Sequence, residues 1–494
     1  MHEIRGYSWR DAGSVVGMLC AGLLLALCAP GAGAAGLMQF YGMALENDPA
    51  YLAAGKERDA GLEERNKGRA GLLPNIAFQY RNGRNRSEVT QPTFFGEQTT
   101  DRSYRSSSSS LTLQQPIFDY EAISAYYYGV AQARHADERF RSRSQELAVR
   151  VAQAYMDALY ATDQIDLVRV QKRAYEAQKT QNERWLAAGE GNRTDVLETQ
   201  ARYDLALAQE IEAQDNLDAA LNTLAAMVGE PIDAADLDAL GGQFAVRPLA
   251  PNDFEHWRAQ ALAHNPELIA LRHSADAADH AIGKARAGHM PKVSAYASAG
   301  RDKSSSESTY GQKYVTNSFG LQVSIPIFAG GGVSSSVRQA VDNRDRLRYE
   351  NDAKTREVLN ELRKQFNLYN SSVAKLRAYQ LAVDSARELT VAVRKSVAGG
   401  ERVNADVLDA EQRYFDALKN LAQARYAYLL AGLKVRQLAG TLAAGDVREV
   451  DGYFAARKPQ AAMDGAPLAS AVPPLSGAPA VRASAAPAGR VEPH

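Results

Sequence analysis

Residues 119–187 read DYEAISAYYYGVAQARHADERFRSRSQELAVRVAQAYMDALYATDQIDLVRVQKRAYEAQKTQNERWLA. This stretch contains no proline and a single glycine, Gly129, over 69 residues. Because a helix interior tolerates proline and glycine least, the stretch predicts one helix about 100 Å long at 1.5 Å per residue. An ordinary globular core does not accommodate such a helix. We therefore expect a molecule built from long helical columns.

The unit that contains this stretch occurs twice in the chain. A second long stretch covers residues 329–398, once the glycines at 330–332 are passed. Shorter landmarks recur 217 or 210 residues later: Asp48-Pro49 as Asn265-Pro266, Pro74 as Pro291, and Pro116-Ile117-Phe118 as Pro326-Ile327-Phe328. A fixed repeat of this kind indicates a duplicated structural unit. We expect two repeats, residues 36–240 and 241–450, each with the order helix, strand, strand, long helix, helix.

Four shorter segments also have helical composition, at about half the length of the long ones. They are residues 37–71, 194–228, 256–288 and 406–439. Two of them placed end to end match one long helix, which predicts a sheaf of columns of equal height. Two segments carry the alternating four-and-three spacing of helices that pack side by side: Tyr414, Leu418, Leu421, Arg425, Tyr428, Gly432, Val435 and Ala439, and Leu217, Leu221, Leu224 and Val228. The alternative is an ordinary amphipathic helix.

Strands are predicted where apolar and polar residues alternate. The apolar members are Ile76, Phe78 and Tyr80 in the first half, and Phe319, Leu321, Val323, Ile325 and Ile327 in the second. Alternating segments of about ten residues suit strands with lipid on one face and water on the other. The serines at 106–110 suit a strand or a loop, and residues 91–101 and 304–311 are expected as turns at the external tips. Because four strands cannot close a barrel and open edges are not tolerated in lipid, copies of the chain must assemble.

The two ends of the chain differ in composition from the repeats. Residues 1–35 combine Arg5 and Arg10, an apolar run over 15–27 and a stretch of small residues, which is typical of a secretory signal peptide. Both cysteines, Cys20 and Cys28, lie in this leader, and the leucines that precede them disfavour a lipid anchor. No other apolar run approaches the ~20 residues of a membrane helix. Residues 451–494 are rich in alanine and proline and are expected to be disordered.

Composition and motifs disfavour several functional classes. With 57 basic and 58 acidic residues the net charge is −1, so no global field attracts nucleic acid. The histidines form no metal-ligand pattern, and the glycines at 330–332 lack the lysine and hydroxyl residue of a phosphate loop, so they predict a strand-to-helix bend. We expect no enzymatic activity, cofactor or metal.

Taken together, the duplicated unit, the leader and the Pro-Ile-Phe turns at Pro116 and Pro326 resemble the TolC family of outer-membrane channel-tunnels, over about residues 37–442. The most specific segments, GNRTDVL at 191–197 and GERVNADVLD at 400–409, resemble the family's two helix-hairpin turns at the periplasmic tip. This resemblance implies an α+β membrane protein that forms a homotrimer. Three chains would contribute four strands each to a 12-stranded barrel and their helices to a periplasmic tunnel. The strand count alone leaves closure of two chains at eight strands equally open.

The resemblance also implies roles for residues at this tip. It places a ring of acidic residues at the tunnel entrance on Asp406 and Asp409, which share a helix face and would favour cations. Their spacing alone is explained by negative charge at a helix start. The resemblance further implies that Arg402 closes the tip through links to Thr194 and Asp195. Val397 stands where the family pattern has a tyrosine, so one link is missing.

The function implied by the resemblance is a passive exit duct, set in outer-membrane lipid with its helices in the periplasm. It would dock a periplasmic membrane-fusion adaptor and an inner-membrane ABC transporter or proton-driven efflux pump. Lack of a lipid anchor favours type I protein secretion over multidrug or small-molecule efflux, and both remain open. An alternative of another class is a soluble periplasmic coiled-coil adaptor, which predicts no membrane-type strands.

Overall fold

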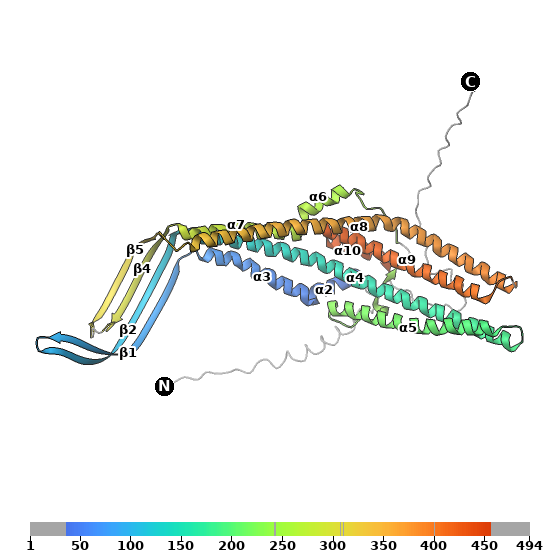
Figure 1. Ribbon diagram of the computed structural model, residues 1–494, viewed down its shortest axis with the longest axis horizontal. Helices are drawn as coiled ribbons and strands as arrows, with labels where there is room; N and C mark the ends of the chain where they lie inside the picture. Colours follow the sequence, from blue (N-terminus) through green and yellow to red (C-terminus); the bar gives the residue numbers. More distant parts are fainter. Residues whose placement is uncertain (1–35, 242–243, 307, 310, 400, 456–494) are drawn as a thin grey trace, which may run out of the picture.

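The computed structural model describes residues 36–455, except 242–243, 307, 310 and 400. The expected leader at 1–35 and the tail from residue 456 onward lie outside the described residues. The molecule is elongated, with a sheet at one end and helical hairpins at the other (Figure 1). None of the helices that the structure describes is both long and apolar enough to cross a membrane.

The two long helices form as predicted. They are α4 (Tyr120–Ala187), with 68 residues, and α8 (Gly332–Ala398), with 67. α4 begins where the Asp119 side chain accepts hydrogen bonds from the N–H groups of Glu121 and Ala122, at 2.9 and 3.3 Å, which satisfies free donors of the first turn. α8 begins after Gly331, whose φ of 79° needs glycine. The glycine run therefore forms the predicted strand-to-helix bend.

Two of the four shorter helical segments are interrupted, which the sequence prediction missed. One divides into α2 (Leu37–Asn47) and α3 (Pro49–Ala70), and its repeat into α6 (Phe254–His264) and α7 (Pro266–Arg286). The break follows from the proline, which excludes helical backbone at the residue before it. Asp48 and Asn265 are accordingly extended, and their side chains cap the next helix. The other two segments are continuous, as α5 (Arg193–Val228) and α9 (Asn404–Leu438).

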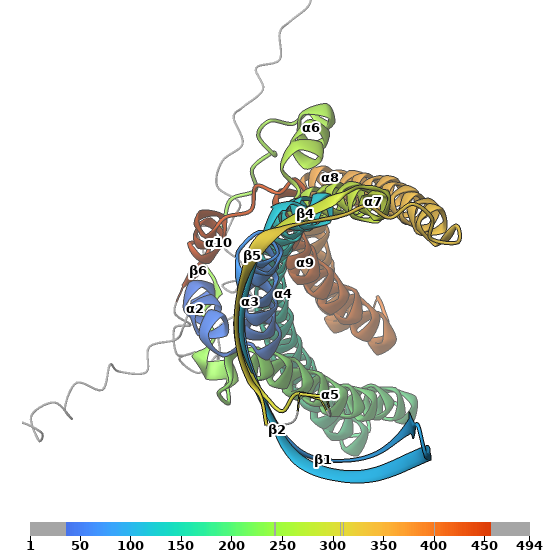
Figure 2. The ribbon, with the colours of Figure 1, turned by 90° about the vertical axis from the view of Figure 1, so that its left-hand side faces the viewer.

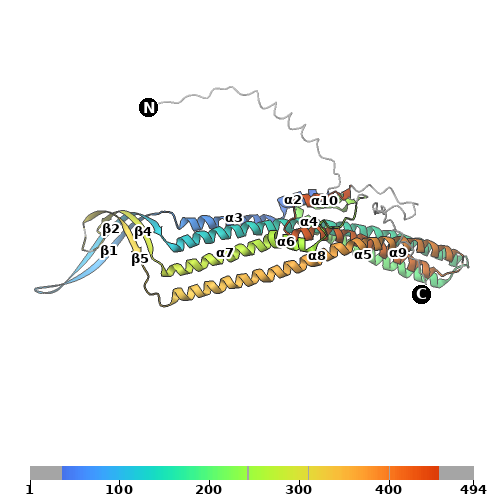
Figure 3. The same cartoon turned by 90° about the horizontal axis from the view of Figure 1, so that it is seen from above.

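The helices form a curved layer of four columns (Figures 2 and 3). α3 and α5 make the first column end to end, α4 the second, α7 and α9 the third, and α8 the fourth. The predicted end-to-end stacking is therefore present. α4 packs against the columns on both of its sides, whereas α8 lies at an edge beside α7, α9 and α6.

Heptad-spaced residues lie between these columns. On α9, Tyr414, Leu421, Tyr428 and Val435 are buried, and on α5, Leu217, Leu224 and Val228 are buried. Arg425, at a heptad position of α9, is half-buried, and this burial lowers the pKa of its guanidinium. The heptad spacing therefore marks the side-by-side helix contacts that it predicted. The alternative of an ordinary amphipathic helix is not needed.

All four long strands pair into one antiparallel sheet with the order β1-β2-β4-β5. Their bounds are β1 (Asn75–Thr93), β2 (Gly96–Phe118), β4 (Lys292–Lys303) and β5 (Lys313–Ser324). The pairing of β2 with β4 joins the hairpins of the two repeats. β1 and β5 are the edge strands. These strands contradict the alternative of a purely helical adaptor.

The first hairpin is longer than predicted. The serines at 106–110 lie in β2, opposite residues 79–83. Residues 91–101, expected as a turn, are strand except at 94–95. Cross-strand contacts stabilise the extension, since the Thr90 and Thr99 hydroxyls lie 2.9 Å apart and Arg86 lies 2.9 Å from Asp101. The second hairpin turns between Lys303 and Lys313, within the expected range.

The two prolines predicted to mark strand-to-helix turns lie in different settings. Pro116 is still part of β2, at a shift in register opposite Ser294, and the turn comes later, at Asp119. Pro326 follows β5, which ends at Ser324 although alternation predicted strand to residue 327. The strand ends there because Ser324 pairs with Lys292, the first residue of β4. Residues 325–331 are therefore irregular.

The register gives the sheet one apolar and one polar face, because residues directly opposite in an antiparallel pair share a face. The apolar face carries Ile76, Phe78, Leu111, Leu113, Phe319, Leu321 and Val323. The polar face carries Gln79, Ser110, Thr112, Ser294, Gln322 and the hydroxyl of Tyr296. The apolar side chains are open to the surroundings, with Phe78 68% and Phe319 90% exposed. The predicted alternation thus extends over all four strands.

A belt of short elements covers the convex side of the middle of the columns (Figure 2). Besides α2 and α6 it contains η1 (Ala234–Asp236), α10 (Ala444–Asp451) and the strand pair β3 (Ala239–Leu240) and β6 (Phe454–Ala455), and η2 (Ala287–His289) follows α7. Phe454 is buried, with its ring 5.2 Å from that of Tyr155. Residues 451–455, expected in a disordered tail, are therefore ordered by packing on the core.

Candidate functional site at the helical tip

Two helical hairpins meet at the end of the molecule that lies farthest from the sheet (Figure 1). The first joins α4 to α5 through residues 188–192, and Asn192 caps α5 by accepting a hydrogen bond from the Thr194 N–H at 3.1 Å. The second joins α8 to α9 through residues 399–403. Val403 precedes α9 and supplies no side-chain cap. The second hairpin therefore starts its returning helix without the bond that fixes the first.

The acidic residues predicted for a tunnel entrance lie in the first turns of α9, and each has an arginine close by. Asp406 lies 4.0 Å from Arg402 in the preceding loop. Asp409 accepts a hydrogen bond of 2.7 Å from Arg202 on α5. Although three positions apart, the two carboxylates therefore find partners on different elements. Within one chain their charge is balanced rather than concentrated.

Other residues predicted for the closed tip have separate contacts. The Asp195 carbonyl oxygen accepts a hydrogen bond from the Thr199 hydroxyl at 2.7 Å. Val397 packs against an apolar cluster of Val393, Val407 and Ala410 between α8 and α9. An apolar residue at this position thus holds the second hairpin together. The links from Arg402 to Thr194 and Asp195 stay a prediction, because they join hairpins of an assembly.

A buried polar network near the tip was not predicted. Asn182 on α4 and Asn404 on α9 both donate to the Thr199 hydroxyl oxygen, at 2.8 and 3.2 Å. Gln178 on α4 donates to the Asn404 side-chain oxygen at 2.9 Å. Thr199, Asn182 and Asn404 are all buried. The network ties the first hairpin to the start of the second.

A second set of polar contacts joins α4 to α9 farther from the tip. Gln171 donates to the side-chain oxygen of Gln412 at 2.8 Å and to the Tyr175 hydroxyl at 3.1 Å. Burial raises the pKa of the Tyr175 hydroxyl. On α4 the residues at 171, 175, 178 and 182 follow heptad spacing, so extending the heptad register through polar residues would have found them.

Charged side chains also join the two helices within each hairpin. Lys172 of α4 pairs with Glu210 of α5, and this contact lowers the pKa of the Glu210 carboxyl. Arg394 of α8 pairs with Glu411 of α9, whose side chain is buried. Because a buried carboxylate needs a partner, the second pair constrains its hairpin more than the first.

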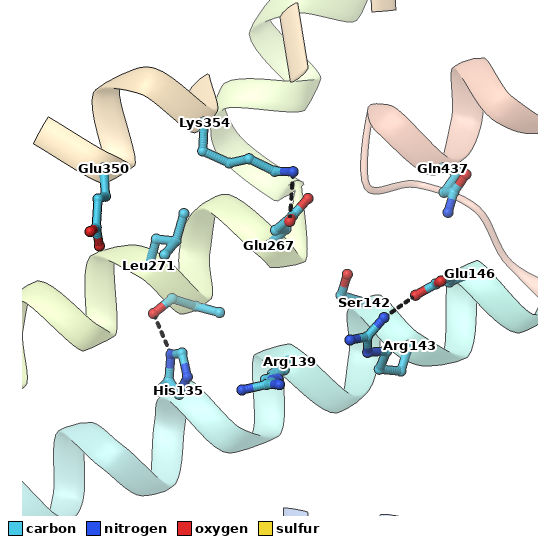
Figure 4. Close-up of a pocket in the computed structure, with 11 residues that line it drawn as sticks. His135, Arg139, Ser142, Arg143, Glu146, Glu267, Leu271, Glu350, Lys354 and Gln437 are labelled. Atoms are coloured by element: carbon cyan, nitrogen blue, oxygen red, sulfur yellow. Dashed lines mark hydrogen bonds and ion pairs between the residues drawn. The ribbon is translucent and has the colours of Figure 1, made fainter. Parts of the chain in front are cut away.

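A cavity of about 730 Å³ lies away from the tip, where the third column passes from α7 to α9 (Figure 4). Several of its polar and charged side chains already have partners within the cavity wall. Lys354 lies 3.0 Å from Glu267, Arg143 lies 2.6 Å from Glu146, and the His135 ring contacts the Ala270 carbonyl at 2.8 Å. Within the described residues, no group of His, Cys, Asp and Glu side chains has the arrangement of a metal site.

Comparison with known proteins gives consistent results. Residues 40–230 and 257–441 match the family described as outer membrane efflux protein. The chain is 50% identical over 433 residues to the alkaline protease secretion protein AprF of Pseudomonas aeruginosa, covering 88% of this chain and 90% of that protein. It is 43% identical over 433 residues to the proteases secretion protein PrtF of Dickeya chrysanthemi, covering 87% and 94%. The fold is similar to that of the Campylobacter jejuni CmeC outer membrane channel, with a TM-score of 0.72, 15% identity, and coverage of 85% and 90%.

Proposed function

Since the chain belongs to the outer membrane efflux protein family, the TolC family that its repeats resemble, we propose that three copies of it form one passive exit duct. The protein resides in the outer membrane, with its helical part in the periplasm. It works as the outer-membrane component of an export system with an adaptor and an inner-membrane transporter. Energy for export would come from the transporter.

The observation that carries the proposal is the amphipathic sheet with two open edges. Its apolar face suits lipid and its polar face suits a water-filled interior. β1 and β5 each present one row of backbone groups that no other described strand pairs with. Because unpaired backbone groups are not tolerated in lipid, β5 of one copy would pair with β1 of the next. Three copies would close a barrel of 12 strands.

The helical layer has matching open edges. α8 exposes Leu381 and Val391 at one edge, and α5 exposes Leu205 and Ile211 at the other. The two edges lie at opposite ends of the curved layer (Figure 2). Contact between α8 of one copy and the α3 and α5 column of the next would cover both edges. In this assembly residues 36–240 and 241–450 act as two repeats around one tunnel.

We assign the gate of this duct to the helical tip. In a trimer, Asp406 and Asp409 of three chains would surround the entrance and favour cations. The pair of Arg402 and Asp406 is weak, because its 4.0 Å separation and half-exposed side chains leave it open to solvent. Arg402 can therefore exchange Asp406 for Thr194 and Asp195 of a neighbouring hairpin. Exchangeable charged contacts of this kind suit a gate.

Type I protein secretion is the cargo pathway that we favour. The two relatives with 50% and 43% identity are both named for protease secretion. An ABC transporter and a membrane-fusion adaptor would be the partners of this pathway. Efflux of small molecules by a proton-driven pump is the second candidate, because the family as a whole is described by efflux.

Fractionation and channel recording test the duct. The full chain expressed in a Gram-negative host should be found in the outer membrane and migrate as a trimer on an unboiled gel. In planar bilayers the purified protein should conduct ions. Recovery of a soluble periplasmic monomer would contradict the proposal. A dimer that conducts would contradict the trimer and would indicate a closed barrel of eight strands.

A further inference from the structure

Positively charged side chains follow the apolar residues on the lipid-facing side of the sheet. On each strand the apolar residues lie toward the helices, and the cations lie nearer the hairpin turn. These cations are Arg84 on β1, Arg105 on β2, Arg301 and Lys303 on β4, and Lys313 on β5. All five are exposed. Arg86 lies on the same face but pairs with Asp101.

The register places two pairs of like charges directly opposite each other. Arg84 is the cross-strand partner of Arg105, and Lys303 is the partner of Lys313. Side chains in such pairs start about 5 Å apart, and like charges there are destabilising. None of these four cations has a carboxylate partner among the residues that the structure describes. Their repulsion would be removed by an anion bound between them.

The opposite face of the sheet does not share this charge. At the same levels it carries Gly83, Asn85, Ser106, Ser108 and Gly300, together with Asp302. Arg81 and Arg102 are its cations in the two strands of the first hairpin. At these levels positive charge is therefore concentrated on the face that also carries the apolar residues, while the acidic residues of that face, Glu88, Glu97 and Asp101, lie nearer the turn of the first hairpin. A general basic tip would show no such preference between faces.

We propose that this cationic band binds the phosphate groups of a phosphorylated glycolipid of the lipid A type in the outer leaflet. The inference rests on the proposed function, which turns the apolar face toward lipid. Acyl chains would then cover Phe78 and Phe319, and the headgroup phosphates would meet the cations nearer the hairpin turns. Arginine and lysine bind phosphate through charge-assisted hydrogen bonds. Bound phosphates would also fix the depth at which the barrel sits in the membrane.

Binding to detergent-solubilised full-length protein tests this proposal. Diphosphoryl lipid A should bind more tightly than the same lipid without phosphates, and inorganic phosphate should not compete at equal concentration. The variants R84Q/R105Q and K303Q/K313Q each remove two cations and should each lose roughly thirtyfold in affinity, from about 1 kcal/mol for each cation near a membrane surface. The variant R81Q/R377Q removes one charge from the opposite face of the sheet and one from α8, and it should bind normally. K303R/K313R should retain binding.

Equal binding of the phosphorylated and dephosphorylated lipids would overturn the inference, and this comparison needs no variant. Full competition by inorganic phosphate would also overturn it, because the band would then be a free-anion site. An equal loss in the control variant would show a non-specific charge effect. Channel conductance of the same preparation separates the two proposals. A conducting trimer without phosphate-dependent binding refutes only the lipid site, whereas a preparation without conductance refutes the duct.

Discussion

α4 and α8 occupy the same place in the two repeats and have nearly the same length, but their surroundings differ. α4 lies inside the layer, between the α3 and α5 column and the α7 and α9 column. α8 lies at the edge and leaves Leu381 67% exposed. The duplication produced two similar helices. Only α4 has neighbouring columns on both sides, because α8 forms the last column of the layer. The difference locates the surface that another copy of the chain would cover.

The packing of the two helices differs in kind as well. On α4, Gly129 approaches the backbone of α3 so closely that a Cβ atom would lie 2.2 Å from the Glu64 carbonyl oxygen. Contacts of α8 are made by side chains, as where Tyr369 stacks on Tyr428 of α9 with ring centres 4.7 Å apart. Near Gly129, α4 therefore contacts its neighbour through the backbone, whereas near Tyr369, α8 contacts its neighbour through side chains.

Charges placed on the α8 edge should have the largest effect. The variant L381E/V391E is expected to abolish the trimer, because at each interface it would bury two carboxylates against the apolar edge of the next copy. Unboiled gel migration and the mass of the detergent-solubilised particle report the assembly. R448E on α10, which lies on the convex side (Figure 2), should leave the trimer intact. A stable trimer of L381E/V391E would remove α8 from the interface.

Adding bulk in the corresponding first parts of the two helices should sharpen the comparison. Gly129→Val is expected to destabilise the protein by about 3 kcal/mol, the upper part of the range for overpacking, because its methyl groups would meet the α3 backbone. Ala340→Val, in the corresponding first part of α8, should change stability by less than about 1 kcal/mol. Thermal unfolding of the two variants measures the difference. Equal losses would show that the two helices are equally close to their neighbours at these positions.

Substitution at the second tip should open the channel. Arg402→Ser removes the arginine that we assign to closure, so single-channel conductance in planar bilayers should rise severalfold. Arg193→Ser alters an exposed arginine at the first tip and serves as the control. Unchanged conductance of the Arg402 variant, or an equal rise in the control, would refute the assignment of closure to the second hairpin.

The smallest effect is expected at the acidic residues. Replacing Asp406 and Asp409 by alanine should weaken block by multivalent cations, because the entrance would lose carboxylates that concentrate cations. Glu198→Ala, at the position of the first repeat that matches Asp409, should leave the block unchanged. Titration of the blocking cation in bilayer recordings compares the variants. Undiminished block would favour a simple helix-start role for both aspartates.

Local signals explain which features could be predicted. The length of α4 follows from the absence of proline over residues 119–187, and the strand faces follow from alternation around Phe78 and Phe319. The breaks at Asp48 and Asn265 were missed although each precedes a proline. Strand ends were misplaced because β5 stops where β4 offers no further partner, which is a property of the pair rather than of either sequence.

The candidate site was only partly accessible from sequence. The positions of Asp406 and Asp409 were identified through resemblance, whereas the contact of Asp409 with Arg202 joins residues 207 positions apart. The same holds for the bond between Asn404 and Thr199. Contacts between helices depend on how each helix is rotated about its axis. A single sequence does not specify that rotation for polar residues.

By itself, the sequence determined the duplication, the two long helices and the alternation of the strands, because each depends on neighbours along the chain or on spacing within one element. The tertiary structure decided which long helix is enclosed, how the strands align and which carboxylates meet arginines. These features depend on the curvature of the layer and on the register between distant segments. For the same reason only the aligned sheet revealed that Arg84 faces Arg105 and Lys303 faces Lys313.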